Sequence, residues 1–222
     1  MSMFEKISTH GVDFYWPMNL SKGVDWCNLD IIINEIVDIH NPHCYFKYYT
    51  PKSSDVVFDV GGCEGLFAKL IEGKVSNVHI FEPVNILCQA MKMTFEDSNN
   101  VYIHQVGVSN ISGSMSFSIT DDVIFCSGVY RESDNKLTIP VITIDDFVKE
   151  HEVVPSLIKI DIEGHEIEAL YGAHDTLEAY HPQIITCIYH EQNDRSEMMR
   201  YLAQFGYRFE MTSMLLNAIM DI

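Results

Sequence analysis

The order of apolar and polar residues changes near residue 54. Before that point the chain is aromatic and irregular, apart from one apolar series at helical spacing: Leu29, Ile32, Ile33, Ile36 and Val37. This series predicts a helix. We therefore expect residues 1–53 to form a helical and aromatic extension, or lid, that packs on a core domain made of residues 54–222.

From residue 54 onward, short apolar runs alternate with segments of helical periodicity. Runs of this kind are typical of strands that are buried on both faces of a parallel sheet. They predict five strands, at residues 56–60, 78–81, 101–106, 157–162 and 184–189. The chain is then predicted to end in two further strands, 207–211 and 214–220, which form an antiparallel hairpin.

The alternation predicts an α/β fold with a doubly wound, mostly parallel seven-stranded sheet and helices on both faces, because strand–helix–strand connections are right-handed. Two segments interrupt it: residues 107–122 predict a hairpin and residues 122–136 a polar loop. Asp194 and Glu197 predict a capping box at the start of a late helix. Ligands of such sheets bind beyond the carboxyl ends of the strands, so the residues after each strand are the candidates for chemistry.

Composition narrows the classes of partner. The 222 residues include 14 Lys and Arg against 32 Asp and Glu, a formal net charge of −18. This charge counts against nucleic acid as a partner and favours a neutral or cationic ligand. No apolar run is long enough to span a membrane. Six widely spaced cysteines without a metal-binding pattern favour reduced thiols and a cytoplasmic protein.

The first predicted strand leads into a glycine-rich turn. Gly61 and Gly62 permit a tight turn in which backbone N–H groups approach a ligand, and Gly65 brings the next helix close to the sheet. The spacing differs from the G-x-G-x-x-G pattern of dinucleotide binders. Asp59 lies two residues before the first glycine, where a carboxylate would repel a pyrophosphate and attract an ammonium group.

The second predicted strand ends in Glu82 and Pro83. A carboxylate at this position can accept hydrogen bonds from both hydroxyls of a ribose. Glu is also a poor residue for capping a helix, which is the structural alternative. Glu82 and Asp59 together indicate a nucleoside with a cationic amino-acid tail and no phosphates, and S-adenosyl-L-methionine fits that description.

The fourth and fifth predicted strands are followed by the candidates for catalysis. Asp161 and Glu163 come directly after a buried strand, and we expect them beside the reacting methyl group or the acceptor hydroxyl. His190 follows the fifth strand, and its ordinary pKa of about 6.5 suits a general base. His165 and Glu166 are interpreted as solvated or structural. No metal site is predicted, because no third ligand lies near Asp161 and Glu163 in the sequence.

Five stretches together resemble the FkbM family of S-adenosylmethionine-dependent methyltransferases. They are VVFDVGGCEGLFAKL (56–70), HIFEPV (79–84), VGVSNISGSMSF (106–117), IPVITIDDF (139–147) and LIKIDIEGHEIEALYGA (157–173). The resemblance implies a class I, Rossmann-like methyltransferase that acts on hydroxyl groups of sugars or secondary metabolites and releases S-adenosyl-L-homocysteine.

The resemblance also implies roles for single residues. Asp59, Gly61, Gly62 and Gly65 would surround the methionine part of the cofactor, Glu82 and Pro83 the ribose, and Gln105 and Val106 the adenine. Asp161, which would also touch the cofactor, would face the acceptor together with Glu163 and His190. Two residues depart from the family pattern: Cys63 replaces an expected Asn, and Ile188 an expected Glu two positions before His190.

These observations predict O-methylation of a saccharide or other small molecule by in-line methyl transfer. His190 is the first candidate for the base and Asp161 the second, with Glu163 orienting the acceptor. Two alternatives remain open: a nicotinamide-dependent oxidoreductase, and a non-catalytic protein that retains the cofactor pocket. The sequence leaves the acceptor and the oligomeric state open.

Overall fold

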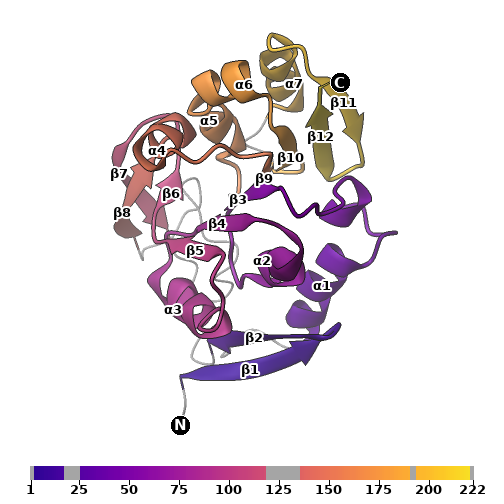
Figure 1. Ribbon diagram of the computed structural model, residues 1–222, viewed down its shortest axis with the longest axis vertical. Helices are drawn as coiled ribbons and strands as arrows, with labels where there is room; N and C mark the ends of the chain where they lie inside the picture. The colour runs from indigo at the N-terminus through magenta and orange to yellow at the C-terminus, as the bar shows by residue number, and fades with distance from the viewer. Residues whose placement is uncertain (1–2, 18–25, 119–135, 191–193, 221–222) are drawn as a thin grey trace.

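Seven strands form one central sheet, as the sequence pattern predicts (Figure 1). The computed structural model describes residues 3–17, 26–118, 136–190 and 194–220. The order across the sheet is β11-β12-β10-β9-β3-β4-β5. The strands are β3 (Val56–Val60), β4 (Asn77–Phe81), β5 (Val101–His104), β9 (Leu157–Ile160), β10 (Gln183–Cys187), β11 (Arg208–Met211) and β12 (Leu215–Ile219).

The direction of the strands agrees with the predicted topology. β3, β4, β5, β9 and β10 pair in parallel, whereas β12 runs antiparallel to both β10 and β11. The chain moves outward from β3 to β5, then returns to β9 on the other side of β3. The carboxyl ends of β3 and β9 therefore flank the point where the strand order reverses, which is where ligands bind in such sheets.

Helices cover both faces of the sheet, because successive residues of each strand point to opposite sides. Val57 and Leu157 pack in one apolar cluster with α1 (Trp26–Val37), α2 (Leu66–Ile71) and α3 (Asn85–Thr94). Phe58 and Ile158 pack in another cluster on the opposite face. The helices of that face are α4 (Ile144–His151), α5 (Glu166–Tyr171), α6 (His174–Tyr180) and α7 (Arg195–Ala203). The described residues also include two short 3-10 turns, η2 (Tyr45–Lys47) and η3 (Glu72–Lys74).

The N-terminal segment is more regular than the sequence pattern predicts. The predicted helix is confirmed as α1, but β1 (Phe4–Thr9) and β2 (Val12–Pro17) form an antiparallel hairpin in the part expected to be irregular. Phe14 and Trp16 are buried two residues apart, which is the period of a strand. β2 lies against α3, where the Tyr15 N–H donates to the Thr94 hydroxyl at 2.8 Å. The role of residues 1–53 as a lid stays a prediction.

A second, three-stranded sheet corrects the predicted hairpin at residues 107–122. β6 (Gly107–Val108) and β7 (Gly113–Ser118) do not pair with each other; both pair with β8 (Lys136–Ile142), β6 in parallel and β7 antiparallel. The interpretation from the sequence failed because the partner strand arrives later in the chain. The polar loop predicted for 122–136 lies outside the described residues except for Lys136, which begins β8.

The capping box predicted for α7 is half confirmed. The Asp194 side chain accepts hydrogen bonds from the backbone N–H groups of Ser196 and Glu197, as an N-cap residue does. The Glu197 carboxylate instead accepts a hydrogen bond from the Tyr171 hydroxyl at 2.6 Å. Among the described helices, none combines the length and apolar character that a membrane crossing requires.

Candidate functional site

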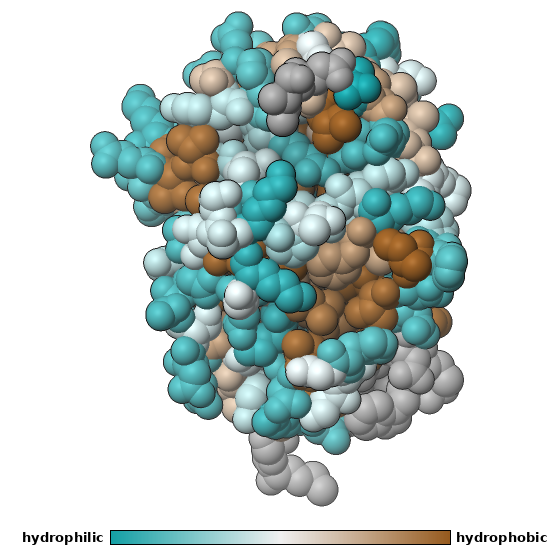
Figure 2. Space-filling view, turned by 45° about the vertical axis from the view of Figure 1, so that its right-hand side comes forward, coloured by the Kyte–Doolittle hydropathy of each residue, from teal (hydrophilic) through white to brown (hydrophobic). Residues whose placement is uncertain are grey.

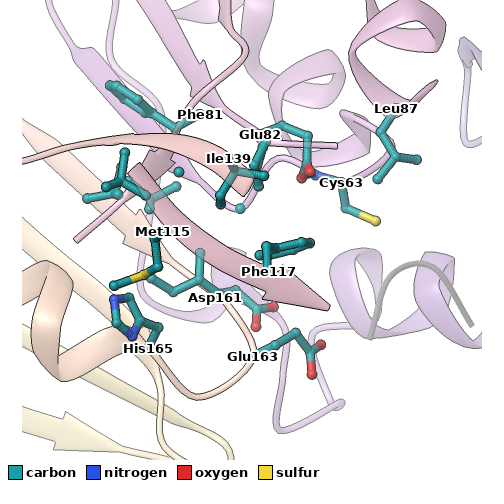
Figure 3. A pocket seen from close by; sticks show the side chains of 17 residues that line it. Cys63, Phe81, Glu82, Leu87, Met115, Phe117, Ile139, Asp161, Glu163 and His165 are labelled. Atoms are coloured by element: carbon teal, nitrogen blue, oxygen red, sulfur yellow. Dashed lines mark hydrogen bonds between the residues drawn. The ribbon is translucent and has the colours of Figure 1, made fainter. Parts of the chain in front are cut away.

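Two cavities open at the carboxyl edge of the sheet and meet there. Gly61, Cys63, Asp161 and Glu163 line both of them. The first cavity, drawn in Figure 3, is otherwise mainly apolar, and Glu82 faces it from the side opposite Asp161 and Glu163. Its other lining residues are Val60, Phe81, Pro83, Leu87, Gly107, Val108, Met115, Phe117, Ile139, Val141, Ile162 and His165.

The second cavity extends toward the N-terminal segment. Besides the four shared residues it is lined by Ile31, Ile32, Glu35, Ile36, His43, Tyr45, Gly62, Glu64, Phe67, Lys159 and Tyr189. No role was predicted for Glu35, His43, Glu64 or Lys159, whereas Tyr45 belongs to the aromatic segment that was predicted as a lid. Glu64, inside the glycine turn, and Lys159, a charged residue within the predicted buried strand 157–162, carried local signals that could have identified them. Glu35, His43 and Tyr45 come from the N-terminal segment, whose place beside the site depends on the fold.

Glu82 is buried and held by the backbone of two neighbouring turns. Its Oε2 accepts a hydrogen bond from the Cys63 N–H at 3.0 Å, and its Oε1 accepts one from the Val84 N–H at 2.8 Å. Burial raises the pKa of Glu82 to about 7 even though these hydrogen bonds favour the charged form. Each carboxylate oxygen can accept a further hydrogen bond, so Glu82 can bind a diol in the first cavity.

The N–H groups of the glycine turn bond within the protein, whereas we expected them to approach a ligand. The N–H groups of Gly61 and Gly62 both donate to the Phe81 carbonyl, so they are not free to bind a ligand. Gly61 has a positive φ of 82°, and a Cβ atom there would lie 1.8 Å from the Asp161 carbonyl oxygen. Gly65, also at positive φ, packs against Met91 of α3 and the Phe95 ring that follows it, and not against a strand as predicted, and it lines neither cavity.

Asp59 is paired with a residue of the same chain. It lies directly opposite Lys159 on the neighbouring strand, and Lys159 Nζ is 2.8 Å from Asp59 Oδ1. Asp59 is 0% exposed and Lys159 only 4% exposed. Lys159 also donates to the Gly61 carbonyl at 2.6 Å. The ammonium partner that we predicted for Asp59 in the cofactor is therefore already supplied by Lys159, and Asp59 lines neither cavity.

Asp161 is the charged residue that connects the two cavities to the N-terminal segment. Its Oδ2 accepts a hydrogen bond from the Tyr45 hydroxyl at 2.8 Å and lies 3.4 Å from His43 Nε2. Burial alone would raise the pKa of Asp161, but His43, Lys159 and His190 hold it well below its usual value. Asp161 is thus ionised at any ordinary pH and can stabilise positive charge.

Glu163, His190 and Glu166 form a connected row. His190 Nδ1 lies 2.9 Å from Glu166 Oε1, and His190 Nε2 lies 3.6 Å from Glu163 Oε2. The buried Glu166 carboxylate also accepts hydrogen bonds from the Ile162 and Gly164 N–H groups. It thereby holds the turn in which Glu163 has a left-handed φ of 57°. Such strained conformations in non-glycine residues are characteristic of functional sites.

His190 lies behind Glu163 and not in the cavity wall. It is 7% exposed and is not among the described residues that line either cavity. Burial would lower the pKa of His190, but Glu166, Asp161 and Glu163 together raise it above its usual value. The family pattern led us to expect a Glu at position 188 to orient His190, but this chain has Ile188 there. Glu166 contacts His190 in its place. Our interpretation of Glu166 as solvated or structural missed its contact with His190.

Of the remaining predicted residues, some line the first cavity and others do not. Pro83 lines the first cavity beside Glu82. Gln105 and Val106 do not line it; the next two residues, Gly107 and Val108, do. His165 is buried, lies 2.9 Å from the Ser109 hydroxyl and also lines the first cavity, so its interpretation as solvated or structural stays a prediction.

Among the residues that the structure describes, two groups of side chains could accommodate a metal ion. The ligand atoms of Asp161, Glu163 and His190 lie within 4.8 Å of one another, as do those of His43, Asp161 and Cys187. His190 is the third ligand that was not evident beside Asp161 and Glu163 in the sequence. His190 already contacts Glu166, and Asp161 already accepts a hydrogen bond from Tyr45. That the site holds no metal therefore stays our prediction.

Comparison with known proteins agrees with the architecture. Residues 59–209 match the family model described as the methyltransferase FkbM domain. The hexuronic acid methyltransferase AglP of Haloferax volcanii is 28% identical over 166 residues, which cover 73% of this chain and 67% of that protein.

Two solved structures are similar in fold. The crystal structure of methyltransferase FkbM from Methylobacillus flagellatus has a TM-score of 0.60 and 23% identity over 78% of this chain. The match covers 46% of that protein, so this chain spans about half of its length. M. jannaschii TYW2 in complex with AdoMet has a TM-score of 0.50 and 9% identity, covering 98% of this chain and 86% of that one. With a family match over most of its length and the predicted sheet order, the chain belongs to the FkbM family of methyltransferases, with the class I, Rossmann-like fold.

Proposed function

We propose that the protein transfers a methyl group from S-adenosyl-L-methionine to a hydroxyl oxygen of a sugar. The observation that carries the cofactor assignment is the charge of the two joined cavities. Their described lining contains one lysine and no arginine, and that lysine, Lys159, is neutralised by Asp59. No lysine or arginine of the described lining is left for a pyrophosphate, and the Gly61 and Gly62 N–H groups already donate to the Phe81 carbonyl. Together these contacts argue against a nicotinamide dinucleotide.

The first cavity suits an adenosine group. Glu82 can accept hydrogen bonds from the ribose hydroxyls, and the apolar side chains of Leu87, Met115, Phe117 and Ile139 suit the faces of an adenine ring (Figure 3). The ionised Asp161 lies where the two cavities join and can stabilise a cationic sulfonium. When bound, S-adenosyl-L-methionine supplies an activated methyl group, so the protein has mainly to align the acceptor and exclude water.

Glu163 is the best placed group to receive the acceptor proton. It lines both cavities, whereas His190 is buried behind it. In the proposed step the hydroxyl donates its proton to Glu163. In the form of the protein with an unprotonated His190, the proton moves on to His190 Nε2, 3.6 Å from Glu163 Oε2, and Glu166 orients the His190 ring. His190 then acts as a positioning residue and proton store, while Asp161 remains an unprotonated carboxylate hydrogen-bonded to Tyr45.

A sugar is proposed as the acceptor because the curated relative is named for a hexuronic acid. The second cavity combines apolar side chains, such as Ile31, Ile32 and Phe67, with hydrogen-bonding groups, such as Tyr189 and Glu163. This mixture suits a sugar ring, which has apolar faces and polar edges.

Calorimetric titration with S-adenosyl-L-methionine, S-adenosyl-L-homocysteine and NADH tests the cofactor. We expect both adenosyl ligands to bind to the wild type and to bind at least about tenfold more weakly to Glu82→Ala. A tenfold loss of affinity corresponds to about 1.4 kcal/mol, the free energy expected from the lost hydrogen bonds to the ribose. Binding of NADH alone would favour an oxidoreductase. Binding of S-adenosyl-L-methionine without conversion to S-adenosyl-L-homocysteine by any sugar would favour the non-catalytic alternative.

The role of Glu163 is tested by replacing it with Gln, which keeps its shape and removes the proton acceptor. We expect kcat to fall by about 10²–10⁴-fold while the Kd of S-adenosyl-L-methionine changes little. Glu178→Gln on the exposed side of α6 is the matched control. An unchanged kcat in Glu163→Gln would contradict the proposed proton transfer.

A further inference from the structure

The second cavity contains more negative charge than the proposed methyl transfer requires. Four carboxylates line it: Glu35, Glu64, Asp161 and Glu163. The one lysine of the described lining is already neutralised by Asp59. An anionic acceptor would therefore meet several carboxylates and no available lysine or arginine in this wall, and like charges at short range cost several kcal/mol in a partly buried site.

Glu35 is the carboxylate that the proposed reaction leaves unexplained. It is half-buried on α1 and faces the second cavity one helical turn after Ile31. Within the described part of the chain its carboxylate has no hydrogen-bond or ion-pair partner. Burial raises the pKa of Glu35, and the nearby charge of Asp161 raises it further, against the influence of His43. A cation placed between Glu35 and Asp161 would relieve both effects.

The wall around Glu35 is apolar. Ile31, Ile32 and Phe67 line the same cavity, and Ile31 is 53% exposed. Figure 2 shows hydrophobic surface gathered on the side of the molecule that carries α1 and α2. An apolar wall beside a desolvated carboxylate is complementary to a sugar ring that carries an ammonium group, since the ring packs on the wall and the ammonium reaches Glu35.

We propose that the acceptor is an amino sugar whose protonated amine binds Glu35. In this respect the chain would differ from the relative named for a hexuronic acid, because sugars bearing a carboxylate would be poor acceptors. This inference rests on the proposed O-methyl transfer and adds the charge of the substrate and the residue that recognises it. Glu35 acts here as a specificity residue and takes no part in the transfer itself.

The test compares three matched glycosides as acceptors: methyl 2-amino-2-deoxyglucoside, methyl glucoside and methyl glucuronide. Formation of S-adenosyl-L-homocysteine gives KM and kcat for each, and calorimetry gives the Kd of S-adenosyl-L-methionine. For the wild type we expect kcat/KM of the amino glycoside to exceed that of the glucuronide at least about tenfold. Glu35→Gln should abolish the preference for the amine over the neutral glycoside through KM, and Glu35→Lys should favour the glucuronide.

Each other outcome overturns a different statement. A wild type that prefers the glucuronide, or a Glu35→Gln variant that keeps the preference for the amine, overturns the inference and leaves the methyl transfer intact. If Glu35→Gln weakens S-adenosyl-L-methionine and leaves the acceptor KM unchanged, Glu35 binds the cofactor and the inference is wrong. If S-adenosyl-L-methionine does not bind to the wild type at all, the proposed function fails with it. Glu178→Gln is again the control for net charge.

Discussion

At the scale of single residues, the site is a set of carboxylates with different partners. Glu82 is held by two backbone N–H groups, Asp161 by a tyrosine hydroxyl and Asp59 by a lysine. Burial favours the neutral form of a carboxyl group, and a cation or hydrogen-bond donor opposes it. The same side-chain chemistry therefore gives a carboxyl group with a pKa near neutrality in Glu82 and a permanently ionised one in Asp161.

The raised pKa of Glu82 predicts pH-dependent cofactor binding. With a pKa of about 7, only about a tenth of the free protein has Glu82 ionised at pH 6, against about nine tenths at pH 8. Because the ionised form accepts the ribose hydrogen bonds better, we expect the Kd of S-adenosyl-L-methionine to fall about tenfold over that range. Titrations with Glu82→Gln, which cannot ionise, should lose this part of the pH dependence. Parallel profiles for the two proteins would contradict the assignment.

At the scale of the elements, the site is held together where β3, β9 and β10 end. Gly61, after β3, lies close to the Asp161 backbone after the neighbouring β9, and the buried pair of Asp59 and Lys159 joins the same two strands two register positions before. The turn after β9 is attached to β10 through Glu166 and His190. The charged side chains of the strand ends thus fix the loops that line both cavities.

The buried pair predicts a marked effect on stability. Lys159→Met leaves Asp59 without its counter-charge in the core, which typically costs about 3–5 kcal/mol. We expect a Tm roughly 6–20 °C lower for a chain of this length. The double variant Asp59→Leu with Lys159→Met should recover much of the loss, because no charge is then left unpaired. Thermal and urea unfolding of the three proteins measure this. A single variant as stable as the wild type would show that the pair contributes nothing.

At the scale of the whole molecule, two apolar clusters cover opposite faces of one sheet, and the acidic site lies at its carboxyl edge. Behind the Glu82 side of the first cavity, where the Glu82 N–H donates to the His104 carbonyl, β4, β5 and α4 bring three histidines together. His79 Nδ1 lies 3.1 Å from His104 Nε2 with the rings stacked, and His151 packs beside them. Burial first, and the neighbouring histidines second, lower the pKa of both His79 and His104 to about 4.

These histidines predict a loss of stability in mild acid. A histidine with a folded pKa of about 4 and an unfolded pKa of about 6.5 binds its proton more readily in the unfolded chain. Its contribution is therefore complete above pH 6.5 and is lost as the pH falls toward 4. His79→Phe, which keeps an aromatic ring in the stack, should reduce this loss by about 3 kcal/mol. Urea unfolding between pH 4.5 and 8 measures it, with the exposed His40→Gln as control; an unaltered pH profile in His79→Phe would refute it.

The sequence alone determined the order of strands and helices and the place of the site. Continuous apolar runs are produced by strands buried on both faces, so β3, β4, β9 and β10 were evident without a structure. Glu82, Pro83, Asp161 and Glu163 were predicted because ligand-binding residues of parallel sheets follow the strands directly, and all four line the first cavity. The motifs around them were sufficient to identify the family.

Only the tertiary structure decided which partner each charged group has. Lys159 was invisible as the partner of Asp59 because the two lie a hundred residues apart and meet only through strand register. The same holds for Glu35 and Tyr45 of the N-terminal segment and for the attachment of His190 to Glu166. Local periodicity records which side of an element is buried, but contacts between distant segments depend on how the elements pack. The charge, protonation and accessibility of the site are set by those contacts.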